Sequence, residues 1–422
     1  MDITIKNCRL LGAEKLFDVE IDEGKITGIR EKSGEGASEE IDAGGRLLAP
    51  SFLDMHFHLD TVLTAGEPRY NSSGTLLEGI EIWGERKRKM TAEDILKRSE
   101  RAVEMCALYG STFIRTHADT TEEDLVSVRA LLEAKKRLVD LCDIQITAFP
   151  QDGIITEKGN AELLERAVEL GADCVGAIPH NEYTREDGVE SIKVAFDIAQ
   201  KYDRDFDGHI DETDDSGSRF LEVVASETIK RNYQGRVTAG HTTAMGSYDN
   251  AYAFKLFGIL KKAGVTIISN PMVNANLQGR FDTYPKRRGV TRIKELSEYG
   301  INVCLGHDDM LDPWYPLGTG DMLQVLFMAV HLAHLTSRRE LLSALDMITE
   351  NAAKALRLKD YGLAGGNRAD LVLLNAKNPI DALRLLGPPL WVIKDGRIIA
   401  STVDGPKIYR NGKAREIDLF TS

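Results

Sequence analysis

The feature that most constrains the fold of this chain is a regular recurrence of short apolar segments through its middle. Eight segments of the kind that forms buried strands lie near His56, Thr116, Thr147, Ala177, Gly208, Ala239, Ile268 and Leu305. The first interval is about 60 residues and the others are about 30 to 37, the length of one strand plus one helix. Eight such units predict a (βα)8 barrel, or TIM barrel, with parallel strands buried on both faces. Periodicity alone leaves an open, doubly wound sheet as the alternative.

Helix signals fill the intervals between these strands. One predicted helix begins after a capping-box-like pattern at residues 91–94 and ends at Tyr109 and Gly110. Others are predicted over about 121–141 and 216–232. Because the first interval is longer than one βα unit needs, we expect an insertion after the first strand that shapes the pocket.

Both ends of the chain differ from its middle, because they have the pattern of short strands and turns. Residues 17–29 contain two alternating segments around a turn, and residues 391–400 have the pattern of a second hairpin. We therefore expect residues 1–48 and 366–422 to form one small β-sandwich domain, and residues 49–365 to form the barrel.

Composition excludes several classes of protein. With 53 Lys and Arg against 66 Asp and Glu, the formal net charge is −13, which disfavours binding to nucleic acid. The N-terminal segment lacks a signal-peptide pattern, and the apolar stretch at 322–335 is too short and too polar to span a membrane. The five cysteines are scattered and never paired as CxxC. We therefore expect a cytoplasmic protein without a disulfide framework.

Residues that could carry chemistry gather where the predicted strands end, as they do in barrel enzymes. Of the nine histidines, only His331 and His334 lie elsewhere, on an apolar helix where we expect core or interface residues. The seven at strand ends are His56, His58, His117, His180, His209, His241 and His307. For His117, His180 and His307 we expect a structural or supporting role.

His56 and His58 point to a metal ion. Two residues apart on a strand, their imidazoles lie on the same face, here the barrel interior. An isolated pair of this kind could equally be two core histidines, but the other polar strand ends disfavour that interpretation. His209 and Asp308 supply further nitrogen and oxygen ligands from strands 5 and 8. Three histidines and one aspartate suit Zn²⁺ or Fe²⁺.

More specific segments extend from strand 1 to beyond strand 8: residues 73–80, 148–151, 176–180, 240–245, 277–289 and 306–316. On these segments the chain resembles the amidohydrolase superfamily and, within it, the bacterial cytosine deaminases. The resemblance implies that His56, His58, His209 and Asp308 hold one divalent metal ion. Many relatives bridge two metals with a lysine at the end of strand 4, and residues 174–180 contain none.

The resemblance also implies catalytic roles. Glu212 matches the residue that protonates the ring nitrogen and helps ammonia leave. The alternative, a carboxylate at a helix start, is common but is disfavoured by this match. His241 and Asp308 are expected to share the task of removing the proton from the attacking water.

Substrate contacts follow from the same comparison. Gln151 matches the residue that reads the amide edge of a pyrimidine, because a carboxamide both donates and accepts. Phe149 and Trp314 could wall the flat ring, and Leu76 could cover it or simply pack in the core. Asp309 is expected beside the ring edge that distinguishes substrates, or else to orient a histidine.

Three positions depart from the family pattern without touching the expected ligands. Ile210 stands where the bacterial enzymes carry cysteine, and Asp152 and Asn181 differ in kind from their counterparts. These departures bear on substrate preference rather than on reaction type.

We therefore expect hydrolytic deamination of cytosine to uracil and ammonia, in pyrimidine salvage, by a homo-oligomer that the resemblance suggests is a hexamer. Isoguanine, 5-methylcytosine and creatinine are alternative small neutral heterocyclic substrates for the same chemistry. A cyclic-amide hydrolase of the dihydroorotase or hydantoinase type is more distant, because the strand 4 lysine is missing. A metal-binding barrel without activity is disfavoured, since it would need no proton shuttle.

Overall fold

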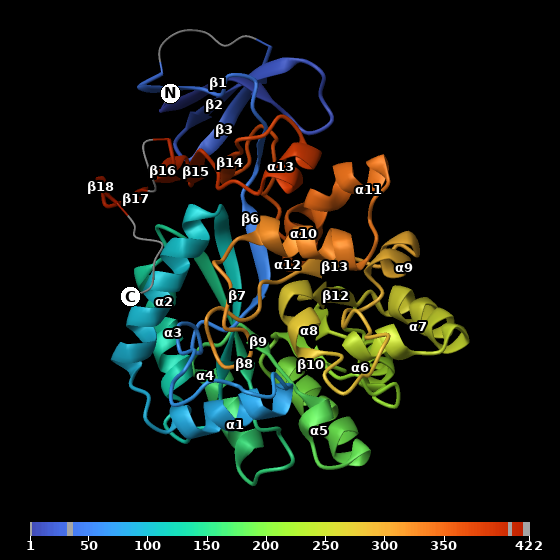
Figure 1. Cartoon of the computed structure of the whole chain (residues 1–422). Helices are drawn as coiled ribbons and strands as arrows, with labels where there is room; N and C mark the ends of the chain where they lie inside the picture. Colours follow the sequence, from blue (N-terminus) through green and yellow to red (C-terminus); the bar gives the residue numbers. More distant parts are fainter. Residues whose placement is uncertain (1, 32–36, 404–406, 417–422) are drawn as a thin grey trace.

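The computed structural model describes residues 2–31, 37–403 and 407–416. Figure 1 shows a large unit of strands and helices with a smaller, mainly β unit at its upper end. At the centre of the large unit is an eight-stranded sheet in which consecutive strands are neighbours and parallel. Its strands are β6 (Phe52–Phe57), β7 (Ser111–Asp119), β8 (Asp143–Phe149), β9 (Cys174–Val175), β10 (Asp205–Ile210), β11 (Val237–His241), β12 (Thr266–Ser269) and β13 (Val303–Leu305).

The sheet closes into a barrel between β6 and β13. A parallel bridge joins Phe57 to Asp308, and the Asp308 amide donates to the His56 carbonyl at 2.7 Å. The buried Asp54 carboxylate holds the same seam, because its Oδ1 accepts from the backbone amides of His56 at 3.2 Å and His307 at 3.0 Å. The predicted barrel is confirmed and the open sheet is excluded. Two of the expected metal ligands lie on the closing seam.

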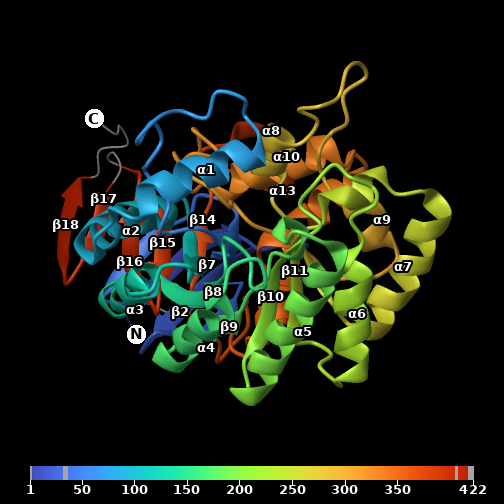
Figure 2. The same ribbon diagram turned by 90° about the horizontal axis from the view of Figure 1, so that it is seen from below.

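Helices surround the barrel strands, as the two views in Figures 1 and 2 show. The helices are α1 (Leu76–Lys87), α2 (Ala92–Leu108), α3 (Val126–Arg137), α4 (Asn160–Leu170), α5 (Arg185–Lys201), α6 (Phe220–Lys230), α7 (Asn250–Ala263), α8 (Pro271–Leu277), α9 (Ile293–Glu298), α10 (Met322–Leu332), α11 (Arg338–Ser343), α12 (Glu350–Leu356) and α13 (Pro379–Leu385). Among the described residues, none of the helices combines the length and apolarity needed to cross a membrane.

The predicted helices form, but two begin later than expected. The α2 helix starts after Thr91, whose hydroxyl accepts from the Asp94 amide at 3.2 Å. The α3 helix begins at residue 126 rather than near 121, because Leu125 takes a left-handed conformation with φ 52°. The α6 helix begins at residue 220, because the preceding loop is bound to Asp211. The Ser218 hydroxyl donates to the Asp211 carboxylate at 2.6 Å. The predicted insertion after the first barrel strand contains α1.

The smaller unit is built from both ends of the chain, as expected for the β sandwich. One sheet has the order β3-β2-β1-β4 and the other β18-β17-β16-β15-β14-β5. Their bounds are β1 (Ile3–Arg9), β2 (Leu16–Asp22), β3 (Lys25–Arg30), β4 (Glu39–Asp42), β5 (Leu48–Pro50), β14 (Leu371–Leu373), β15 (Trp391–Lys394), β16 (Arg397–Ser401), β17 (Lys407–Arg410) and β18 (Lys413–Glu416).

The two sheets share one apolar core, in which Ile5 and Ile21 of the first sheet pack with Leu371 and Ile393 of the second. The sheets are antiparallel except where β4 pairs with β1 in parallel. Residues 1, 32–36, 404–406 and 417–422 of the predicted domain lie outside the described residues. The exact division at residues 49 and 365 stays a prediction.

Candidate active site and metal centre

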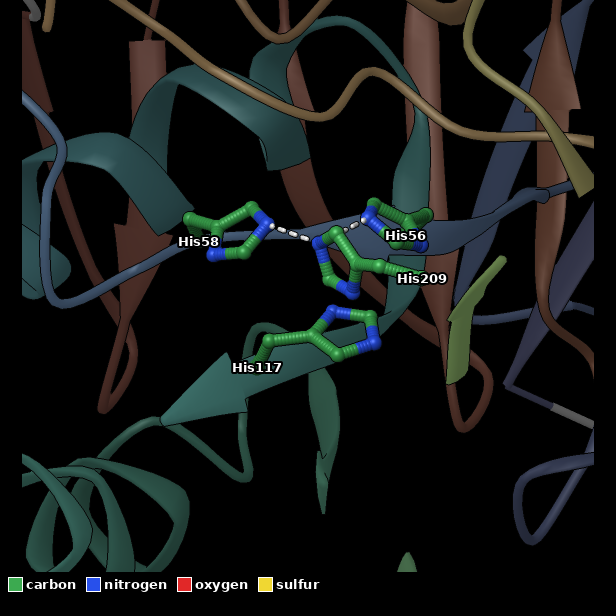
Figure 3. Close-up of side chains that lie close together, drawn as sticks. All are labelled: His56, His58, His117 and His209. Carbon is green, nitrogen blue, oxygen red and sulfur yellow. Dashed lines mark hydrogen bonds between the residues drawn. The ribbon is translucent and has the colours of Figure 1, made fainter. Parts of the chain in front are cut away.

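The four expected metal ligands converge at the carboxyl ends of three barrel strands. The Nε2 atoms of His56 and His58 lie 3.2 and 3.1 Å from Nε2 of His209. The same two atoms lie 3.4 and 3.5 Å from Oδ1 of Asp308. All four side chains are buried, and Figure 3 shows the ring nitrogens of the three histidines turned toward one another.

This arrangement fits a single divalent ion. An ion that binds four ligands tetrahedrally at about 2.0–2.1 Å keeps the ligand atoms about 3.3 Å apart. The four separations above, from 3.1 to 3.5 Å, match that spacing. Burial and the neighbouring histidines hold the pKa values of His56, His58 and His209 well below their ordinary range. The three imidazoles are therefore neutral, the form that binds metals.

His117 lies against this cluster, and with His56, His58 and His209 it makes a second group of possible ligands. Its nitrogens, however, both face acceptors of the protein. Nε2 lies 3.0 Å from the Asp207 carboxylate, and Nδ1 lies 3.3 Å from the Phe57 carbonyl. This geometry supports the expected structural role and leaves Asp308 as the fourth candidate ligand.

His241 stands between two carboxylates at the end of β11. Its Nδ1 lies 3.1 Å from Oε1 of Glu212 and 3.7 Å from Oδ2 of Asp308. Burial lowers the pKa of His241, but the Glu212 and Asp308 charges outweigh it and leave the pKa raised. The three predicted catalytic side chains, hereafter the catalytic group, therefore meet at one nitrogen of the His241 ring.

Two asparagines beside His241 were not predicted. The side-chain nitrogen of Asn274 lies 2.9 Å from His241 Nδ1, and that of Asn270 lies 3.3 Å from the same atom. Strand 7 was the one barrel strand whose end was given no candidate residue of any role, although Asn270 follows β12 directly. Its position at a strand end was the signal that could have found it.

A pocket opens onto these groups, lined by His58, Leu76, Phe149, Gln151, Ile178, His209, Glu212, His241, Leu277, Asp308, Asp309 and Trp314. The structure thus brings together every predicted site residue, since His56, absent from this lining, contacts His209 in the wall behind. Ile178 and Leu277 were not predicted. Both belong to segments that carry the family resemblance, so the signal was present without an assigned role.

Aromatic side chains wall the pocket. The Phe149 ring stacks on that of His209, with centroids 4.0 Å apart and planes 19° apart. Trp314 donates from Nε1 to the Leu76 carbonyl at 3.3 Å, which joins the β13 side of the pocket to the start of α1. Leu76 lines the pocket and also packs on the apolar cluster of Trp83, Trp314 and their neighbours. Both interpretations of Leu76, as cover and as packing, therefore agree with the structure.

Asp309 lies in the pocket wall beside the candidate ligand Asp308. Burial, together with the nearby Asp312 and Asp308 carboxyls, holds its pKa well above the usual range. Asp312 in turn accepts from the backbone amide of Trp314 at 3.0 Å. Asp309 therefore neighbours carboxylates, and it stands where it can meet a ring edge.

Comparison with known proteins places the chain in a family. Residues 88–400 match the model of the amidohydrolase family. The chain belongs to that family. The resemblance stated from the sequence is confirmed, and this amidohydrolase is a hydrolase that acts on C–N bonds.

Relatives agree over nearly the whole length of the chain. A crystal structure of 5-methylcytosine deaminase from Klebsiella pneumoniae, liganded with 5-fluorocytosine, is 47% identical with a TM-score of 0.92, covering 94% of this chain and 97% of that one. N-isopropylammelide isopropyl amidohydrolase from Pseudomonas sp. (strain ADP) is 31% identical over 409 residues, 94% of this chain and 97% of that protein. Pterin deaminase from Rhizobium rhizogenes is 29% identical over 389 residues, 90% of this chain and 87% of that protein.

The remaining histidines of this amidohydrolase lie outside the pocket lining. Burial lowers the pKa values of His180 and His307 to about 4, and His307 accepts from the Gly320 amide at 3.0 Å. His331 and His334 are exposed at the end of α10, so the expectation that they are core residues is wrong. An interface role for these two is untested.

Proposed function

We propose that this amidohydrolase is a metal-dependent deaminase of a cytosine-type base. The observation that carries the proposal is the position of His241 beside both Glu212 and Asp308, in a pocket that Gln151 also lines. Hydrolytic deamination needs an acid that protonates the ring nitrogen beside the attacked carbon, and the buried Glu212 carboxyl would supply that proton. The 47% identity to a solved 5-methylcytosine deaminase supports the same reaction class.

The ion would be held by His56, His58, His209 and Asp308. When bound, such an ion supplies the Lewis acidity that lets water act as a nucleophile near neutral pH. Asp308 and His241 take the proton of the attacking water. Glu212 delivers a proton to the ring nitrogen and later takes one back from the newly added hydroxyl. The proton taken from the water passes to the amino group, the C–N bond to that group breaks, and ammonia leaves. Base and water are thereby converted to the oxo base and ammonia.

The pocket suits a small flat ring. The Gln151 carboxamide can donate to and accept from a cyclic –NH–C=O edge, while Phe149 and Trp314 present apolar faces. Cytosine and 5-methylcytosine are the two substrates we propose, and the 47% identical neighbour favours the second. A cyclic-amide hydrolase remains disfavoured, because Ile178, Pro179 and His180 follow β9 where that type of enzyme carries the bridging lysine.

Ammonia release across a panel of bases tests the proposal. Cytosine, 5-methylcytosine, isoguanine and creatinine would be compared on enzyme loaded with Zn²⁺ or Fe²⁺, with metal content measured on the same sample. We expect one ion per chain and turnover of a cytosine-type base. Turnover of isoguanine or creatinine alone would replace the substrate, and no turnover of any base would end the deaminase proposal.

We also propose that the enzyme works as a cytoplasmic homo-oligomer, as the family resemblance implies, up to a hexamer. Size-exclusion chromatography with light scattering tests the assembly. A monomer at micromolar concentration would contradict it.

A further inference from the structure

A buried lysine connects the cover of the pocket to the strand ends beneath it. Lys87 lies in the last turn of α1, and its side chain is only 4% exposed. Its ammonium group donates to Asp119 at 3.2 Å, to the Thr121 hydroxyl at 2.6 Å and to Asp152 at 2.5 Å. Three donors thus meet three acceptors, the full capacity of a lysine. None of these groups belongs to the catalytic group of Glu212, His241 and Asp308.

The same face of α1 makes a second contact with β7. Trp83, one turn before Lys87, donates from Nε1 to the Asp119 carboxylate at 2.9 Å. Its ring lies 6.3 Å from that of Trp314 in the pocket wall. Asp119, the last residue of β7, therefore accepts hydrogen bonds from both Trp83 and Lys87, one turn apart on α1.

Asp152 links Lys87 to the residue expected to bind the substrate, because it directly follows Gln151 in the chain. Its carboxylate is held by Lys87 and by the Thr121 hydroxyl at 3.1 Å. On the other side, the Asn181 side chain donates to the Gln151 carbonyl at 3.2 Å. Asp152 and Asn181 are two of the three positions at which the sequence departs from the family pattern, and both hold the turn that carries Gln151.

We propose that Lys87 is a positioning residue that locks α1 to the Gln151 turn and so sets the affinity of the pocket for its ring. Burial lowers the pKa of Lys87, but Asp119 and Asp152 outweigh it and raise the pKa. The ammonium is therefore charged, and removing it leaves two carboxylates facing each other without their shared cation.

The test is Lys87→Met, which keeps the length of the stem and removes the charge. We expect KM for the best base of the panel to rise about tenfold or more while kcat changes less than about threefold, because binding rather than the chemical step is lost. Hydrogen exchange should accelerate in the peptide covering α1, and metal content should not change. Asp152→Asn should show a smaller rise in KM, since its amide oxygen still accepts from Lys87. The double variant should recover part of the loss.

The matched control is Lys135→Met. Lys135 bridges α3 to Asp173 at 2.6 Å, a pair of similar length before β9, at the amino end of the barrel strands. We expect its KM and α1 exchange to equal those of the unchanged enzyme. Wild-type KM and wild-type α1 exchange in Lys87→Met would overturn the proposal, as would a fall in kcat without a rise in KM. If Lys87→Met does not fold, the KM of Asp152→Asn decides in the same way.

The KM readout rests on the proposed function, whereas the exchange readout does not. If the unchanged enzyme turns over no base of the panel, the proposed function fails. The exchange rates of α1 then still decide whether Lys87 locks the cover.

Discussion

Nδ1 of His241 lies 3.1 Å from Oε1 of Glu212, although His241 ends β11 and Glu212 follows β10 in the chain. Both side chains are buried in the pocket wall. An imidazole and a carboxylate at this distance share a proton, and the pKa of His241 is raised accordingly. Under the proposed function, this contact would let a proton move within the pocket without exchange with solvent.

Glu212→Gln should separate metal binding from turnover. The amide keeps the shape of the side chain but cannot carry a proton to the ring nitrogen, so we expect kcat to fall by about 10² to 10⁴. Metal content should be unchanged, because Glu212 is not one of the four ligands. Ammonia release and metal analysis on the same sample measure both. Glu165→Gln, on the outer surface beside Lys201, is the control, and an active Glu212→Gln enzyme would remove the shuttle role.

His209→Asn should empty the metal centre, because His209 contacts both other histidine ligands. Loss of bound ion should also lower the melting temperature, since a ligand present at about a thousand times its dissociation constant stabilises a fold by about 4 kcal/mol. Calorimetry with and without a chelator measures this difference. His334→Asn, an exposed histidine, should melt like the unchanged protein with full metal content. A chelator that leaves the melting temperature unchanged would argue against the proposed metal site.

Sequence reasoning predicted the barrel, and the gathering of the candidate metal ligands at its rim, for a physical reason. The carboxyl ends of parallel strands meet at one rim, so residues such as His56, His209 and Asp308 could be brought together without knowing any loop. The prediction of the catalytic group followed from family resemblance rather than from spacing alone. Its geometry, with His241 between Glu212 and Asp308, then came from the structure.

Other parts depended on tertiary contacts that no local pattern encodes. Lys87 contacts Asp119 and Asp152, which lie 32 and 65 residues away in the chain. Its place at the end of α1 therefore did not indicate a positioning role. The late start of α6 depends on Asp211 reaching into the next loop. Asn274 lies one turn into α8, where only the packed position of His241 reveals its use.

The five cysteines should resist thiol reagents in the folded protein. All are buried, and burial raises the pKa values of Cys8, Cys174 and Cys304 to about 12. Because the thiolate is the reactive form, almost none is present at pH 8. A colorimetric thiol assay should count no cysteine in the native enzyme and five after denaturation. Fast modification of one native cysteine would show that its surroundings open in solution.

Gly79→Ala should disturb the cover of the pocket, because a methyl group at this position would lie 2.3 Å from the indole of Trp314. Either α1 or Trp314 must move, and overpacking of this kind costs about 1–3 kcal/mol of folding free energy. Since Trp314 also bonds to the Leu76 carbonyl, we expect KM for the substrate to rise together with the loss of stability. Thermal unfolding and steady-state kinetics measure the two effects.

The same helix offers the control for this prediction. A methyl group at Gly84 would meet no atom within 4 Å, so Gly84→Ala relieves the entropy cost of glycine in a helix without a clash. We expect it to stabilise the protein by about 0.5–1 kcal/mol and to leave KM unchanged. If Gly79→Ala behaved like Gly84→Ala, α1 would not press on Trp314 in solution. The affinity of the pocket would then have to be set by the strand ends alone, without its cover.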